Sequence, residues 1–145
     1  MPRIVDGDNL LGTWPGRSRS PSDKRALSRE IDALVRRERR ACVLVFDGAA
    51  PEGIAFAADT VFSGPGRSAD AVILARLRAA ADPRGYTVVT HDRSLADRCR
   101  AQGARIESPR DFRSRLAGGP SGEKPAQEDD VDAWLEVFGE DPSEG

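Results

Sequence analysis

Short apolar runs alternate with amphipathic stretches along the first 116 residues of the chain. The runs are rich in β-branched residues and end at polar or glycine positions, which is typical of strands buried in a parallel sheet. The stretches between them carry apolar residues three and four positions apart, which predicts helices. The expected strands are RIV (3–5), ACVLVFDG (41–48), DTVFSG (59–64), one within YTVVTHDRSL (86–95) that ends just before Asp92, and ARIES (104–108). The expected helices span 24–40, 68–81, 94–102 and 109–116.

This order of elements predicts the fold class. Strands that alternate with helices form a central, mostly parallel sheet with helices on both faces. We therefore expect a three-layer α/β domain over residues 2–116, with Ser68 as a helix N-cap and Pro109 in the first turn of the last helix. Gly7 is expected to break the first strand, which then feeds a loop, and the segment 12–23, rich in Gly, Pro, Ser and Arg, is also expected to be a loop.

Composition limits the class of protein. The chain is 39% hydrophobic and 32% charged, which suits a globular domain. No apolar run is long enough to cross a bilayer, and the first residues lack the layout of a signal peptide. Cys42 and Cys99 have no CxxC spacing, so we expect reduced, packed thiols in a cytoplasmic protein without a membrane partner.

Charge divides the chain into two parts. Residues 117–145 hold one lysine and nine acids, a net charge of −8, so the rest of the chain carries +6. A basic globular part favours nucleic acid as a partner, because phosphate contacts dominate that affinity. Residues 117–145 read as a flexible acidic linker and tail by their Gly, Pro, Ser and acidic content.

The tail ends in one apolar pattern at helical spacing. Val131, Trp134, Leu135 and Phe138 stand at i, i+3, i+4 and i+7, so this segment is able to form a short amphipathic helix. Three outcomes stay open: binding of a protein partner, docking on its own domain, or disorder.

Four aspartates stand at the ends of predicted strands or just beyond them. Asp6, Asp47 and Asp92 follow strands, and Asp70 opens a helix after another. Because parallel strands end at one edge of a sheet, these side chains are expected to converge. Gathered carboxylates repel one another unless a hard cation such as Mg²⁺ or Mn²⁺ lies between them. Such a site suits attack of metal-activated water on a phosphodiester.

A covalent phosphatase is the competing chemistry for the DGD segment at residues 6–8. The haloacid-dehalogenase-like family carries DxDxT after its first strand, and this chain has both acids but Leu10 at the last position. No lysine follows a predicted strand, since the two lysines are Lys24 and Lys124. The metal site is therefore the preferred interpretation, and the phosphatase stays an alternative.

Four segments in order resemble the NYN domain of the YacP-like family, within the wider PIN-like nuclease group. They are IVDGDNLLGTWP, VLVFDG, VFSGPGRSADAVI and VVTHDRSLADRCRAQGARIESPRDF, between residues 3 and 116. The resemblance implies a PIN-like, Mg²⁺- or Mn²⁺-dependent endoribonuclease, with mRNA at the ribosome as one substrate. By position it makes Asp6, Asp70 and Asp92 metal ligands, with Asn9 and Asp47 in support.

Other matched positions are assigned to substrate contact or differ from the family. Thr90 and Arg93 flank Asp92 and are expected to orient a ligand or contact the substrate. Asp8 stands where the family has a bulky residue, and we expect it to face solvent. Arg67 replaces an acid, and His91, where serine is common, is expected to be a polar surface residue.

Basic and aromatic side chains outside these motifs are candidates for RNA binding. Two groups flank the first long helix: Arg36, Arg37, Arg39 and Arg40 crowd its end, and Arg17, Arg19, Lys24 and Arg25 precede or open it. We expect part of this set to contact phosphate, and the alternative for the arginines at the helix end is that they stabilise the helix dipole. Trp14 either stacks on a base or pins its own loop. A non-catalytic module that binds RNA or the ribosome through the same surface is the alternative to the enzyme.

Overall fold

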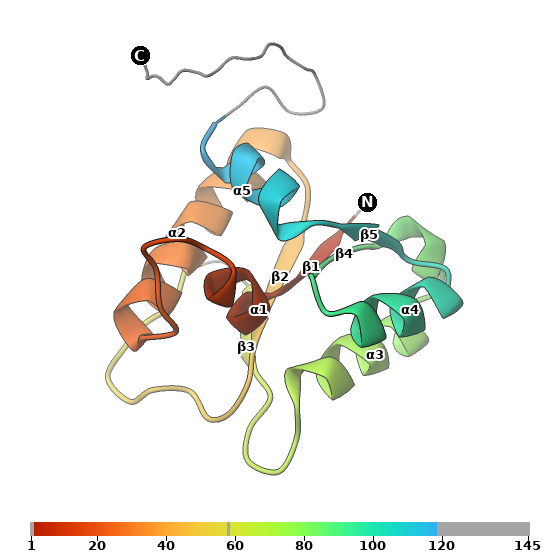
Figure 1. The fold of residues 1–145 in the computed structure, drawn as a ribbon, viewed down its shortest axis with the longest axis horizontal. Coiled ribbons are helices and arrows are strands. Elements are labelled where there is room, and N and C mark those ends of the chain that lie inside the picture. The colour runs from red at the N-terminus through yellow and green to blue at the C-terminus, as the bar shows by residue number, and fades with distance from the viewer. Residues whose placement is uncertain (1, 58, 119–145) are drawn as a thin grey trace.

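The computed structural model describes residues 2–57 and 59–118, built around one five-stranded sheet (Figure 1). Every strand pairs in parallel with its neighbours, in the order β3-β2-β1-β4-β5. This confirms the predicted α/β class with a parallel central sheet. The strands are β1 (Arg3–Asp6), β2 (Cys42–Phe46), β3 (Asp59–Phe62), β4 (Thr87–Val89) and β5 (Arg105–Glu107).

Helices cover both faces of this sheet and complete the predicted three layers. One core cluster joins the sheet to α1, α2 and α5, and a second joins the other face to α3 and α4. Figure 1 shows α3 and α4 together on one side, with α2 and α5 on the opposite side. The helices are α1 (Gly7–Gly12), α2 (Pro21–Glu38), α3 (Ala69–Ala79), α4 (Arg93–Ala101) and α5 (Pro109–Leu116), with a 3₁₀ turn at Pro83–Gly85.

The ends of the helices follow local side-chain chemistry. The Ser68 hydroxyl accepts from the backbone N–H of Ala71, and Pro109 opens α5, as predicted. α2 starts earlier than the predicted residue 24, because Ser20 caps it and Pro21 is preorganised for its first turn. It ends at Arg39, whose φ of 56° is left-handed.

The expected loop after β1 is wrong, because the chain turns at once into the short helix α1. Leu10 and Leu11 on this helix are fully buried. Gly7 starts it with no room for a side chain, since a Cβ there would overlap the ring of Phe46. The helix is therefore held by packing against β2.

The direction of α2 decides which side chains meet at each edge of the sheet. A helix that links two parallel strands must return from the carboxyl edge to the amino edge. The start of α2 consequently lies at the carboxyl edge and its end at the amino edge, where β2 begins. The strand order also reverses between β1 and β4, and a crevice for ligands forms at the carboxyl ends of such a pair.

Other expectations meet the fold as follows. No helix within residues 2–57 and 59–118 is both long and apolar enough to cross a bilayer. Cys42 and Cys99 are free and buried, as predicted, and burial raises the pKa values of their thiols to about 12 and about 11. The predicted tail helix lies outside the described residues.

Candidate active site

One pocket of about 470 Å³ lies at the carboxyl edge of the sheet, where the sequence predicts a site. The four aspartates and the one asparagine predicted as catalytic all line it, so the strand ends do bring them together. They are Asp6, Asn9, Asp47, Asp70 and Asp92. Three further side chains, from α1, the following loop and α2, complete the wall. The lining residues are Asp6, Asp8, Asn9, Arg19, Lys24, Asp47, Asp70 and Asp92.

Asp6 is the most buried acid of the pocket, with 5% of its surface exposed. It is the last residue of the central strand β1, and the Thr90 hydroxyl donates to its Oδ2 over 3.0 Å. The pKa of Asp6 is raised to about 7, mainly because the carboxyl group is buried. The Thr90 hydrogen bond lowers this pKa, and the charges of Asp70, Asp47 and Asp8 raise it. The charged groups that act on Asp6 are therefore other acids.

Asp92 and Asp70 approach the same pocket from the starts of two helices. Asp92 caps α4 by accepting from the backbone N–H of Leu95 over 3.2 Å, and its own N–H donates to the Thr90 hydroxyl over 3.1 Å. Asp70 lies in the first turn of α3. Burial raises its pKa, followed by the charges of Asp92 and Asp47. The acids thus act on one another across the pocket.

Asn9 joins α1 to the loop after β4. Its side-chain oxygen accepts from the backbone N–H of His91 over 2.7 Å. This bond and the one between Thr90 and Asp6 both span the ends of β1 and β4, where the strand order reverses. They fix the Asp92 loop relative to Asp6.

Asp8 corrects an expectation, because it lines the pocket instead of facing solvent. Its side chain is 14% exposed, and its Oδ2 accepts from the backbone N–H of Asp47 over 2.7 Å. Asp47 Oδ1 in turn accepts from the N–H of Ala69 at the start of α3 over 2.7 Å. α1 turns Asp8 inward, which is why the expected loop misplaced it.

Two cations, Arg19 and Lys24, complete the pocket. The sequence names both as candidate phosphate contacts but does not predict that they lie beside the aspartates. Lys24 Nζ lies 3.6 Å from Asp8 Oδ1 and 5.2 Å from the centroid of the Phe46 ring. Arg19 Nε donates to the backbone oxygen of Asp8 over 3.0 Å. The available signal was the direction of α2, whose first turn must lie at the carboxyl edge.

Three predicted substrate contacts do not line this pocket. Thr90 is 3% exposed and its hydroxyl donates to Asp6, which agrees with the expected role of orienting a ligand rather than with the alternative of substrate contact. Arg93, the first residue of α4, is exposed on the surface. Trp14 packs against the core below the guanidinium of Arg17, whose carbon is 3.8 Å from the ring centroid. Of its two interpretations, the structure favours the one in which it pins its loop.

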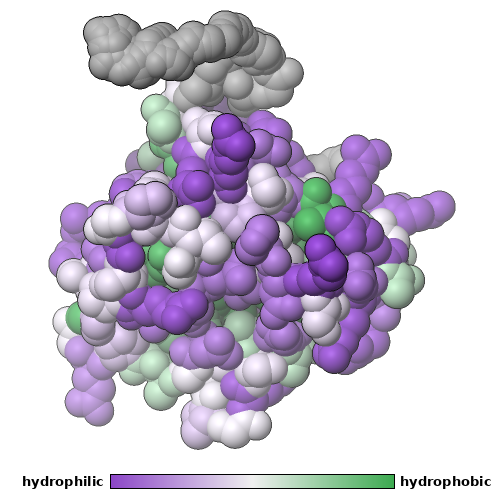
Figure 2. Space-filling model, viewed as in Figure 1, coloured by the Kyte–Doolittle hydropathy of each residue, from purple (hydrophilic) through white to green (hydrophobic). Residues whose placement is uncertain are grey.

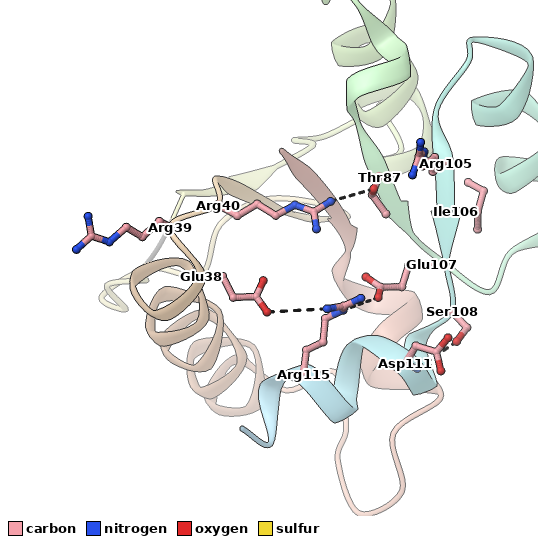
Figure 3. Close-up of a pocket in the computed structure, with 10 residues that line it drawn as sticks. All are labelled: Glu38, Arg39, Arg40, Thr87, Arg105, Ile106, Glu107, Ser108, Asp111 and Arg115. Atoms are coloured by element: carbon pink, nitrogen blue, oxygen red, sulfur yellow. Dashed lines mark hydrogen bonds and ion pairs between the residues drawn. The ribbon is translucent and has the colours of Figure 1, made fainter. Parts of the chain in front are cut away.

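The arginines at the end of α2 lie at the opposite edge of the sheet. Arg40 donates to the hydroxyl of Thr87, the first residue of β4, over 3.0 Å (Figure 3). Arg36 pairs with Asp32 on its own helix at 2.9 Å, and Arg37 donates to a backbone oxygen of α5. The prediction that these three arginines bind substrate therefore has no support from proximity to the aspartates.

The oxygen donors of the pocket match a hard divalent cation in chemistry. Carboxylate and amide oxygens are the ligands that Mg²⁺ and Mn²⁺ prefer, and a cation between them would relieve the repulsion that raises the pKa of Asp6. In the described part of the chain, however, no group of three His, Cys, Asp or Glu side chains is arranged to hold a metal ion. The donor set fits a metal, although the acids do not form a coordination shell.

The face of the molecule seen in Figure 2 is largely polar, with small and separate hydrophobic areas. On this face, nothing resembles the broad apolar patch of a stable protein interface. A charged, solvated ligand suits it better.

Comparisons with known proteins agree with this fold. A family model described as YacP-like NYN domain matches residues 3–132. A crystal structure of a mutant of Rae1 (YacP) from Bacillus subtilis is 21% identical, with a TM-score of 0.66 over 87% of this chain and 86% of that chain. Another structure of Rae1 is 19% identical, with a TM-score of 0.66 over 81% and 74%. These likenesses show the fold, and no curated protein matches.

Proposed function

We propose, because the chain belongs to the YacP-like NYN domain family, that it is a metal-dependent endoribonuclease that cleaves RNA phosphodiester bonds. The observation that carries this proposal is the convergence of five aspartates in one pocket, where burial and mutual repulsion raise the pKa of Asp6 to about 7. Crowded like charges are costly to hold together, and five acids against two cations leave the pocket with excess negative charge, which favours a ligand of opposite charge.

The side chains of the pocket have separable roles. Asp6, Asp70 and Asp92 would hold Mg²⁺ or Mn²⁺, which when bound supplies activated water and neutralises phosphate charge. Thr90 orients Asp6 through its hydroxyl, and Asn9 fixes the loop that carries Asp92.

The two cations line the opposite wall from the acids of α3 and α4. Lys24 and Arg19 would attract the scissile phosphate and stabilise the charge that develops on it. Lys24 is held by Asp8, so its ammonium is oriented before the substrate arrives.

The first test compares cleavage of a mixed-sequence, structured RNA by the wild type and by Asp6→Asn, with Mg²⁺ or Mn²⁺ present. The matched control is Asp97→Asn, which removes an acid from the exposed face of α4. We expect cleavage by the wild type and the control, and loss of cleavage with EDTA or with Asp6→Asn. Repeating the assay with translating ribosomes tests whether mRNA at the ribosome is the substrate.

Other outcomes identify the alternatives. RNA or ribosome binding without cleavage under either condition would favour the non-catalytic binding module. Hydrolysis of a small phosphomonoester with a trapped aspartyl-phosphate would favour the phosphatase. A circular dichroism melt of each variant shows whether it is folded.

A further inference from the structure

A second pocket, of about 310 Å³, lies beside the candidate active site and has no assigned role. It is formed by the end of α1, the loop after β4 and the first turns of α5. No acid is among its lining residues, in contrast to the five aspartates of the first pocket. The lining residues are Thr13, His91, Ser108, Pro109, Arg110 and Arg113.

The two pockets share a wall. His91 lines the second pocket, and its backbone N–H donates to Asn9, which lines the first, over 2.7 Å. The next residue, Asp92, is back in the first pocket. Both pockets therefore flank the crevice between the ends of β1 and β4. An RNA strand bound at the aspartates would enter the second pocket by passing over the hydrogen bond between His91 and Asn9.

The second pocket is lined by the positive charges of Arg110 and Arg113 and by the imidazole ring of His91. Arg113 donates through Nη1 to the backbone oxygen of Thr13 over 3.2 Å, and its guanidinium carbon lies 5.9 Å from the centroid of the Trp14 ring. Its charge is thus held in place at the pocket. Arg110 is exposed on the first turn of α5, and His91 is also exposed.

We propose that this second pocket holds the nucleotide next to the cleaved phosphodiester of a single-stranded RNA. The inference rests on the proposed function and adds a subsite to it. The phosphate of that nucleotide lies against Arg110 and Arg113, and its base stacks on the His91 ring. Arginine is suited to phosphate, and histidine is one of the side chains on which unstacked bases lie.

The arrangement makes clean variants available. The wall between the pockets uses the backbone of His91, so replacing its side chain leaves the bond to Asn9 in place. Arg110 is exposed, and no ion pair of Arg110 is found within residues 2–57 and 59–118. His91→Ala, His91→Phe and Arg110→Ala are the test variants. Arg100→Ala, which removes an exposed arginine from α4, is the matched control.

The experiment measures kcat and KM on a single-stranded oligoribonucleotide, and its dissociation constant from the same variants carrying Asp6→Asn. His91→Ala should weaken binding by about 5-fold to 150-fold, the range for one stacked base, and His91→Phe should restore it. Arg110→Ala should reduce the slope of log K against log salt by about 0.7, as expected for one phosphate contact on a single strand. KM should rise with kcat nearly unchanged.

Each outcome decides the proposal. Binding constants equal to those of Arg100→Ala, or no rescue by His91→Phe, would overturn the subsite even if the wild type cleaves RNA. Absent cleavage with the predicted changes in binding would overturn the nuclease and leave the second pocket supported as a binding site for an RNA nucleotide. A wild type that neither binds nor cleaves RNA would overturn both. Saturable binding of a free mononucleotide, lost in Arg110→Ala, with no effect of the variants on RNA would assign the pocket to that ligand instead.

Discussion

Each end of strand β1 buries a charged side chain, and the two side chains differ in whether an opposite charge is paired with them. Arg3 at the amino end is 1% exposed and lies between two acids, with Nη1 2.8 Å from Glu38 and Nε 3.4 Å from Glu107. Asp6 at the carboxyl end is 5% exposed, and the described residues include no cation paired with it. Its charged neighbours are other acids.

The pockets above these ends differ in the same way. At the amino edge, Glu38, Glu107 and Arg115 form ion pairs across a pocket of about 670 Å³ (Figure 3). At the carboxyl edge, five aspartates share a smaller pocket with two cations. Charges that are paired with opposite charges stabilise one another, whereas crowded like charges repel and favour the binding of a ligand of opposite charge. The comparison teaches that volume is a poorer guide to the reactive site than the balance of charge.

Breaking the balance at the amino edge should have the largest effect. Arg3→Met leaves Glu38 and Glu107 buried without their central cation. We expect the free energy of unfolding to fall by about 3–5 kcal/mol, as for a broken buried ion pair. Urea denaturation measures it. Arg36→Ala, which breaks an exposed pair on α2, should cost less than about 1 kcal/mol. Equal losses in the two variants would show that burial of Arg3 adds nothing.

The carboxyl edge should respond to pH with the opposite sign from a salt-bridged acid. The pKa of Asp6 is about 7 in the folded protein and near 3.8 in the unfolded chain. Between these values the folded protein binds more protons, so its stability should fall as pH rises from about 4 to about 7, by up to about 1.4 kcal/mol per pH unit. Urea titrations in EDTA measure this slope.

Asp6→Asn provides the reference for that slope. Asparagine has no titrating proton, so the difference in stability between wild type and variant should grow toward neutral pH. A difference that is constant from pH 4 to 7 would contradict the raised pKa. Adding Mg²⁺ or Mn²⁺ at neutral pH should raise the midpoint of the wild type more than that of the variant.

Changing a partner of the acids should have the smallest effect of the three. Thr90→Val removes the hydroxyl that donates to Asp6 and accepts from the N–H of Asp92. Loss of such an outer contact costs about 10-fold to 100-fold in activity or metal affinity. Thr90→Ser keeps the hydroxyl and should retain most activity. Initial rates over a metal titration distinguish these cases, and equal rates for valine and serine would remove the role of the hydroxyl.

The fold was accessible to sequence reasoning because its elements are locally consistent. Apolar runs, the Ser68 cap and Pro109 identify the elements, and parallel pairing then brings Asp6, Asp47 and Asp92 to one edge. α1 was missed because a helix of six residues, with glycine at each end, has no periodicity to detect. Its packing depends on Phe46, which is 39 positions away in sequence.

The position of the basic residues could not be predicted for a different reason. Arg36, Arg37 and Arg40 form the densest cluster along the chain, but density does not say at which edge of the sheet a cluster lies. The direction of a connecting helix does, and it places Lys24 with the aspartates and the three arginines away from them. Charge in a sequence has to be placed on the topology before it is assigned to a site.

Gly7 connects the geometry of the candidate site to the packing of the core. Its backbone lies so close to the Phe46 ring that no larger residue fits, and its φ is not among the positive values, so space and not flexibility requires glycine. α1 carries Asp8 and Asn9 immediately after this contact. The position of the Phe46 ring therefore determines how far Asp8 and Asn9 lie from Asp6. A larger residue at position 7 would require a smaller one at position 46, and any shift of α1 that results would move Asp8 and Asn9 relative to Asp6.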